Sequence, residues 1–195
     1  FWIQNQFSKA QRKIYHHTKV KLKEKNMNAD LLKRWEEIKE QQPKARIRDV
    51  SVLLGVSEAE LLASKLGNGV SIIKEDFPAF LKATEELGYV MALTRNEACV
   101  HERKRTYKNV SVNGQTALVV GDEIDLRVFL RDWKYGFYVE ESGMCSFQFF
   151  SKSGDAIHKI YKTDSSNEDG WKKIKSEFFS EGIQIEKPQT KENPI

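Results

Sequence analysis

The apolar positions in the first part of the chain recur at helical spacing. Residues 28–43, NADLLKRWEEIKEQQP, place apolar side chains on one side of a helix that Pro43 ends, namely Leu31, Leu32, Trp35 and Ile38. Residues 46–67 then predict a short helix, a turn at Gly55 and a second helix. Ser57 and Glu60 stand three residues apart, which is the signature of a capping box at the start of that second helix.

From residue 70 onward the pattern changes to alternation of apolar and polar positions, which is typical of strands. It predicts a strand at 70–73, a helix at 75–87, and strands at 89–95, 123–130 and 135–141. Residues 100–121 predict two strands joined at Asn113–Gly114, and 144–164 predict a hairpin turning at Ser153–Gly154. A closing helix is expected at 165–179. The order predicts an α+β fold, with a large antiparallel β-sheet, an N-terminal helical cap and packed helices.

Charge divides the chain into three parts. Residues 1–26 carry a net charge of +6, although the whole chain is only +4, so residues 27–195 carry −2. We interpret 1–26 as a basic leader that is flexible or not native, because Met27 resembles a natural start; 27–182 as the folded domain; and 183–195 as a polar tail. No run of about 18 apolar residues or signal peptide is present, and Cys99 and Cys145 are isolated, which predicts a cytoplasmic protein without a membrane span.

The two helices of residues 46–67 resemble a helix-turn-helix, but their charge argues against DNA. Glu58 and Glu60 occupy the positions where base-contacting residues would lie, and carboxylates repel a polyanion. We therefore expect no nucleic-acid partner for these helices, and the basic leader is the remaining segment that could bind one.

Few residues suggest catalytic or metal chemistry. Phosphate-binding loops and paired metal motifs are missing from the sequence. Cys99 and His101 are two apart and would share a strand face, but a small buried cysteine beside a partly exposed histidine is the simpler interpretation. His158 is expected on the surface. Arg127 is unusual, because it lies within the apolar run EIDLRVFLRDW; it either faces solvent, paired with Asp125 or Asp132, or holds a ligand.

Four segments together resemble the first half of the HemS/HmuS-type hemin-degrading factors, cytoplasmic proteins of bacterial haem uptake. They are RWEEIKEQQPKARIRDVSVLLGVSEAELLASKLG, RNEACVHERKRTYKNVSVNGQTALVV, DLRVFLRDW and SFQFFSKSGDAIHKIYKTD. The resemblance runs from about Leu32 to Phe179. It implies a large antiparallel sheet with helices, present twice in the full-length family, and haem (iron protoporphyrin) as ligand or substrate.

The resemblance also implies a site. In the family, an axial histidine follows the first half, and the arginine of the DLR element, Arg127 here, lies on the other side of the haem. That histidine has no match before the chain ends at TKENPI, so a second HemS-like half or a homodimer is expected to complete the site. Within this chain we predict Arg127 and Phe129 on one strand face at the haem, His101 as the substitute ligand of the haem iron, and Arg95 at a propionate.

Two functions remain open from the sequence. One is a haem-binding protein that carries haem or forms part of a haem-degrading, iron-releasing enzyme, with haem itself as the substrate. The other is a non-haem assembly module, half of a larger complex with an empty inherited pocket.

Overall fold

The computed structural model describes residues 28–96 and 98–180, and these belong to two compact units, Phe1–Leu54 and Gly55–Ile195. The first unit contains a helix over residues 28–41 and α2 (Ile47–Leu54), as the helical spacing predicts. The interpretations of 1–26 as a leader and of 183–195 as a tail lie outside the described residues. Among the described residues, no helix is both long and apolar enough to cross a bilayer.

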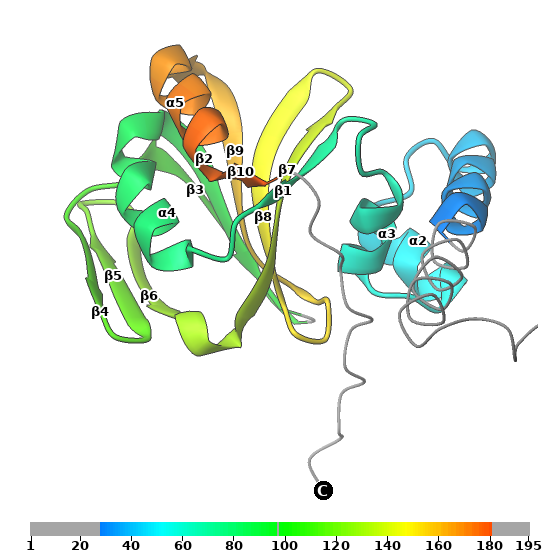
Figure 1. The fold of residues 1–195 in the computed structure, drawn as a ribbon, viewed down its shortest axis with the longest axis horizontal. Coiled ribbons are helices and arrows are strands. Elements are labelled where there is room, and N and C mark those ends of the chain that lie inside the picture. The colour runs from blue at the N-terminus through cyan, green and yellow to red at the C-terminus, as the bar shows by residue number, and fades with distance from the viewer. Residues whose placement is uncertain (1–27, 97, 181–195) are drawn as a thin grey trace, which may run out of the picture. The chain divides into compact units, whose positions relative to one another are not determined.

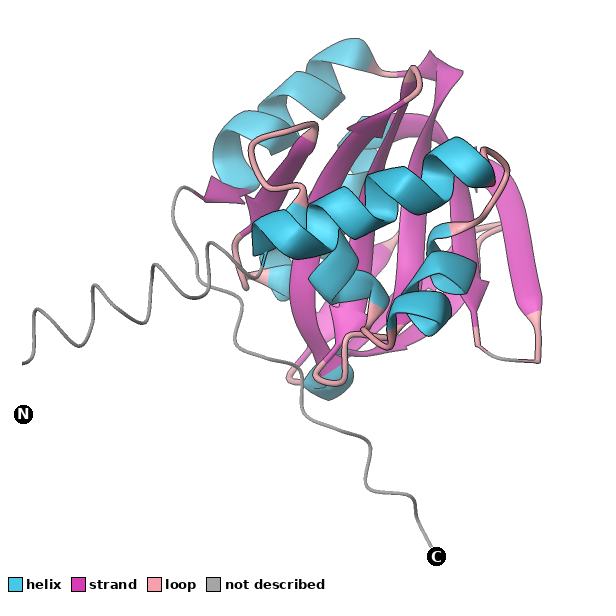
Figure 2. Ribbon diagram, turned by 90° about the vertical axis from the view of Figure 1, so that its right-hand side faces the viewer, coloured by secondary structure: helices cyan, strands magenta, loops and turns pink. Residues whose placement is uncertain are grey.

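A seven-stranded antiparallel sheet organises the second unit (Figures 1 and 2). Its strand order is β10-β1-β7-β8-β9-β2-β3. The strands are β1 (Val70–Ile73), β2 (Gly88–Arg95), β3 (Val100–Thr106), β7 (Trp133–Glu141), β8 (Met144–Ser151), β9 (Ala156–Ser166) and β10 (Phe179–Ser180). The large antiparallel sheet predicted from the alternating pattern is thus confirmed.

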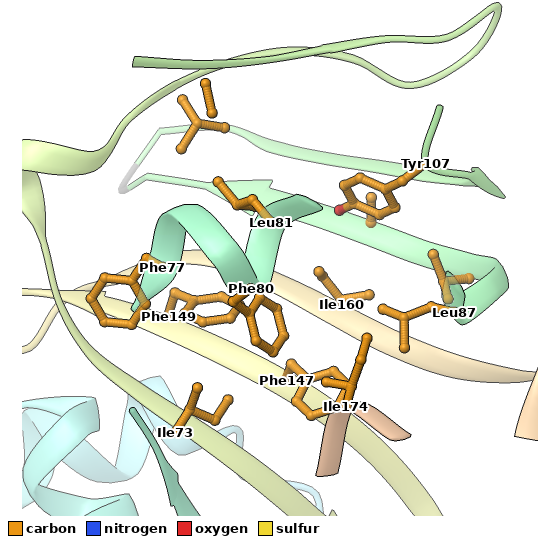
Figure 3. Packing of buried hydrophobic residues seen from close by; sticks show 14 of the residues in the cluster. Ile73, Phe77, Phe80, Leu81, Leu87, Tyr107, Phe147, Phe149, Ile160 and Ile174 are labelled. Atoms are coloured by element: carbon orange, nitrogen blue, oxygen red, sulfur yellow. The ribbon is translucent and has the colours of Figure 1, made fainter. Parts of the chain in front are cut away.

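Helices cover both faces of this sheet (Figure 1). On one face lie α4 (Phe77–Ala83), the 3₁₀ turn η2 (Thr84–Leu87) and α5 (Glu168–Phe178). Phe80 of α4 packs edge-on against Phe147 and Phe149 of β8 (Figure 3). Trp171 of α5 stacks on Phe147 with ring centroids 4.6 Å apart. The opposite face carries α3 (Glu58–Ser64), which starts with the predicted capping box of Ser57 and Glu60.

The prediction of two strands over residues 100–121 did not include the break between the two sheets. This segment forms three strands, because the chain leaves β3 at Tyr107 and enters a second, three-stranded sheet of order β4-β5-β6. This small sheet consists of β4 (Val110–Asn113), β5 (Thr116–Val120) and β6 (Asp125–Phe129), and the short 3₁₀ turn η3 (Leu130–Asp132) follows it. The predicted Asn113–Gly114 turn joins β4 to β5, with Gly114 at φ +57°. Ala117, Val119 and Val128 on its inner face join the main core.

Candidate functional site

Arg127 and Phe129 lie on the outer face of the small sheet. Along β6 the side chains alternate, so Val128 is buried while Arg127 and Phe129 are exposed. Leu118 of β5 is directly opposite Arg127, and Thr116 is directly opposite Phe129. Side chains directly opposite one another in an antiparallel pair are neighbours. The prediction that Arg127 and Phe129 share one strand face is therefore confirmed.

This outer face carries three exposed apolar side chains beside its arginine, and it also carries Asp125 and Thr116. The exposed fractions of Phe129, Val120 and Leu118 are 54%, 50% and 37%, which are high for such residues. Val120 is two residues along β5 from Leu118 and therefore lies on the same face, directly opposite Asp125. We call Leu118, Val120, Arg127 and Phe129 the outer face of the small sheet. Exposed apolar groups gathered around a cation suit a flat, apolar ligand that carries oxygen or charge.

The guanidinium of Arg127 has no hydrogen bond or ion pair to any residue that the structure describes. The pairing with Asp125 or Asp132 considered from the sequence is not formed: Asp132 accepts from Arg131 at 3.5 Å. A guanidinium presents five donors in a fixed fork. In this conformation all of them are available to a ligand.

Arg95 is bound within the protein. Its guanidinium, near the end of β2, pairs with Glu58 at the start of α3, and Lys159 of β9 donates to the second oxygen of Glu58 at 3.3 Å. All three side chains are largely shielded from solvent, and burial lowers the pKa of Lys159. The structure therefore gives Arg95 a place in a buried ion cluster, and propionate binding by Arg95 stays a prediction.

His101 lies in the other sheet from Arg127. It is exposed on β3, the edge strand of the large sheet. On the same face of β3, Arg103 and Arg105 both pair with Glu123, which precedes β6. No contact joins His101 to Arg127, and the residues that the structure describes contain no cluster of three or more His, Cys, Asp or Glu suited to a metal. Iron ligation by His101 stays a prediction. Cys99, expected to be buried, is exposed.

The expectation that His158 lies on the surface is wrong. Its side chain is 3% exposed, and both ring nitrogens have partners: Tyr107 Oη lies 2.6 Å from Nε2, and Thr94 Oγ1 lies 2.9 Å from Nδ1. Burial lowers the pKa of His158 to about 4 and raises the pKa of Tyr107. Because His158 and Lys159 are both buried, alternation along β9 does not mark an exposed face.

A separate polar cavity lies at the end of β3. It has a volume of about 210 Å³ and is lined by Tyr89, Arg105, Thr106, Lys108 and Asp122. This is below the usual range of ligand pockets, and its lining is too polar for a large apolar disc. None of the four residues predicted at the haem lines it. The outer face of the small sheet is therefore the better candidate site.

Comparison with solved structures assigns the fold to a class of haem proteins. Apo-PhuS, a heme-binding protein from Pseudomonas aeruginosa, matches with a TM-score of 0.79 at 37% identity, over 86% of this chain and 51% of that one. ChuS, an E. coli heme oxygenase, matches with a TM-score of 0.75 at 30% identity, over 83% of this chain and 49% of that one. This chain thus has the fold of one half of these proteins.

The family follows from the sequence comparison. The model of the family described as "Haemin-degrading HemS.ChuX domain" matches residues 55–178, and the chain belongs to this family. The hemin transport protein HmuS of Yersinia pestis is 35% identical over 174 residues, which are 85% of this chain and 50% of that protein. The chain spans about half the length of the curated relatives it matches. The resemblance inferred from the sequence is confirmed.

Proposed function

We propose that this chain binds haem in bacterial haem uptake, in the cytoplasm, either as a carrier or as part of a haem-degrading, iron-releasing enzyme. One observation carries the proposal: Arg127 is exposed and unpaired among the described residues, beside Leu118, Val120 and Phe129. The family and the haem-binding relatives support it. The relatives' names concern proteins about twice this length, so the activity is inferred for this chain.

The outer face of the small sheet fits the organic part of haem. The macrocycle is a broad apolar disc, and Phe129, Val120 and Leu118 offer it exposed apolar surface. Arg127 would donate hydrogen bonds to an oxygen of the bound group, and a contact to a propionate would be charge-assisted. Haem itself supplies the redox chemistry when it is bound. The residues of this chain hold and orient the disc.

The same face fits the iron less well. Iron in haem takes an axial ligand such as histidine, and His101 lies in the large sheet without contact to Arg127. We therefore propose that a second HemS-like half, or a second copy of this chain, completes the coordination. The openness of the outer face supports this assembly.

A haemin titration tests the proposal. The Soret band is followed for the wild type, for Arg127→Ala and for Arg131→Ala, which removes an arginine of equal charge four residues away that pairs with Asp132. We expect saturable binding that Arg127→Ala weakens about tenfold, or about 1.4 kcal/mol, and that Arg131→Ala leaves unchanged. If both variants weakened haemin binding equally, Arg127 would act only through its positive charge and not through a specific contact.

The titration also separates the remaining alternatives. A ligand-field change in His101→Ala would identify His101 as an iron ligand, whereas an unchanged spectrum would exclude it. Loss of the Soret band when a reductant is added in air would indicate degradation, and a stable spectrum with transfer to an acceptor would indicate a carrier. The absence of any saturable shift would favour the assembly module with an empty pocket, and light scattering would then report its oligomeric state.

A further inference from the structure

The small sheet is an insertion whose two ends meet at one histidine. The chain leaves the large sheet after Thr106, the last residue of β3, and returns to it at Trp133, the first residue of β7. Tyr107 begins the insertion, and its hydroxyl lies 2.6 Å from Nε2 of His158. The ring of Trp133, at the far end, stacks on the ring of His158 with centroids 6.2 Å apart at 29°. Tyr107 and Trp133, at the two ends of the insertion, therefore both contact the ring of His158.

His158 is in turn fixed to the large sheet. It lies on β9, between β8 and β2, where it is directly opposite Phe149 and Thr94. Thr94 Oγ1 lies 2.9 Å from Nδ1 of the ring. A neutral imidazole has one donor and one acceptor nitrogen, and here both are used, so rotation of the ring would break two buried hydrogen bonds. The ring is therefore an oriented support.

The contacts beyond Tyr107 pass its position on to the strands of the small sheet. Immediately after Tyr107, the carbonyl of Lys108 accepts from Val120 N at 3.2 Å, and Asn109 Nδ2 donates to Val120 O at 2.8 Å. Val120 ends β5, whose Leu118 is directly opposite Arg127 of β6. A shift of Tyr107 relative to the large sheet therefore moves β5, and with it the strand that carries Arg127.

We propose that Tyr107 and His158 are positioning residues that fix the outer face of the small sheet against the large sheet, and with it the place where Arg127 and Phe129 meet haem. This rests on the proposed function for the ligand, but the mechanical part stands on the contacts alone. Neither residue touches the outer face: Tyr107 is 1% exposed and His158 is 3% exposed. Their effect on a ligand is indirect and passes through the small sheet.

The test compares Tyr107→Phe with Ser146→Ala. The first removes only the hydroxyl at His158 and keeps the ring. The second removes a similarly buried hydroxyl on β8, the acceptor of Gln148 Nε2, with both partners in the large sheet. Amide hydrogen exchange is measured on the full chain, together with the dissociation constant for haemin. Both variants lose one buried hydrogen bond, so both can melt at a lower temperature than the wild type. The comparison therefore depends on where exchange changes, not on the melting temperature.

For Tyr107→Phe we expect amide exchange about tenfold faster in residues 116–120 and 125–129, with β7 and β8 unchanged, and haemin binding weakened about fivefold. Ser146→Ala should leave the small sheet's exchange and the haemin affinity unchanged. The proposal is overturned if Tyr107→Phe leaves exchange in the small sheet unchanged, or if both variants affect exchange and haemin alike. If the wild type does not bind haemin, the proposed function fails, and the exchange result still decides whether the two residues position the small sheet.

Discussion

At the scale of single residues, Arg127 and Phe129 lie on one exposed face of β6, whereas His158 is buried. The alternation of EIDLRVFL was sufficient to predict the shared face, since side chains two residues apart on a strand point the same way. The environment of His158 depends on Tyr107, 51 positions away, and on Thr94 and Trp133. Local alternation cannot report such a partner. For the same reason the sequence did not show that Arg95, predicted at a propionate, pairs with Glu58.

Burial of His158 makes stability depend on pH. Its pKa falls from 6.5 to about 4 in the folded protein, so below pH 6.5 the unfolded chain binds more protons than the folded one. The free energy of unfolding therefore falls as pH drops from 6.5 towards 4, by about 2 kcal/mol at pH 5 and about 3 kcal/mol in full. Above pH 6.5 this contribution is complete.

The contribution of His158 to the free energy of unfolding is measured by urea unfolding of the wild type and of His158→Gln at pH 7.5, 6, 5 and 4.5. The difference between the two proteins should shrink as the pH falls, because glutamine does not titrate. A difference that stays constant over this range would show that His158 does not carry the effect.

At the scale of elements, alternation and helical spacing identified the strands and helices of the second unit, including the capping box at Ser57. They did not reveal that β3 and β4 belong to different sheets, because both segments alternate and only three residues, 107–109, separate them. Strand partners depend on packing between distant segments, so the division into two sheets needed the structure.

The buried ion cluster of Glu58, Arg95 and Lys159 should contribute strongly to the free energy of unfolding. Glu58→Gln leaves Arg95 and Lys159 as two shielded cations without a carboxylate, and we expect a loss of about 3–5 kcal/mol. The matched control is Glu168→Gln, because Glu168 is also the first residue of its helix and pairs with Lys162, but it is exposed. That variant should lose at most about 1 kcal/mol. Similar losses in both, by urea unfolding, would contradict a buried ion cluster.

The approach of α5 to η2 depends on Gly170. A Cβ at this position would overlap the backbone carbonyl of Glu86. Glycine to alanine in a helix normally stabilises by about 1 kcal/mol, but here we expect a loss of about 1–3 kcal/mol, because backbone must move. Ser176→Ala, exposed on the same helix, should be neutral or slightly stabilising. A thermal melt in which Gly170→Ala gains stability would show that α5 approaches η2 less closely.

At the scale of the whole molecule, the second unit has the architecture of one half of PhuS and ChuS, and it presents the outer face of the small sheet openly. The sequence resemblance predicted this family and its fold, and residues 55–178 confirm them. The predicted haem ligands of this chain do not lie together on the outer face. We therefore inferred that a second HemS-like half or a second copy of the chain completes the haem site. His101, Arg95 and Arg127 occupy an edge strand, a buried ion cluster and an open face.

The most direct measurement of the central claim is the position of haem on the protein. Ferric haemin is paramagnetic and broadens nearby amide signals in a ¹H–¹⁵N spectrum, and zinc protoporphyrin is the diamagnetic control with the same disc and propionates. The account predicts that haemin broadens the signals of β5 and β6 most and leaves those of α3 and β10 sharp, and that Arg127→Ala weakens the effect. Broadening centred on any other element, or none at all, would contradict a haem site on the outer face of the small sheet.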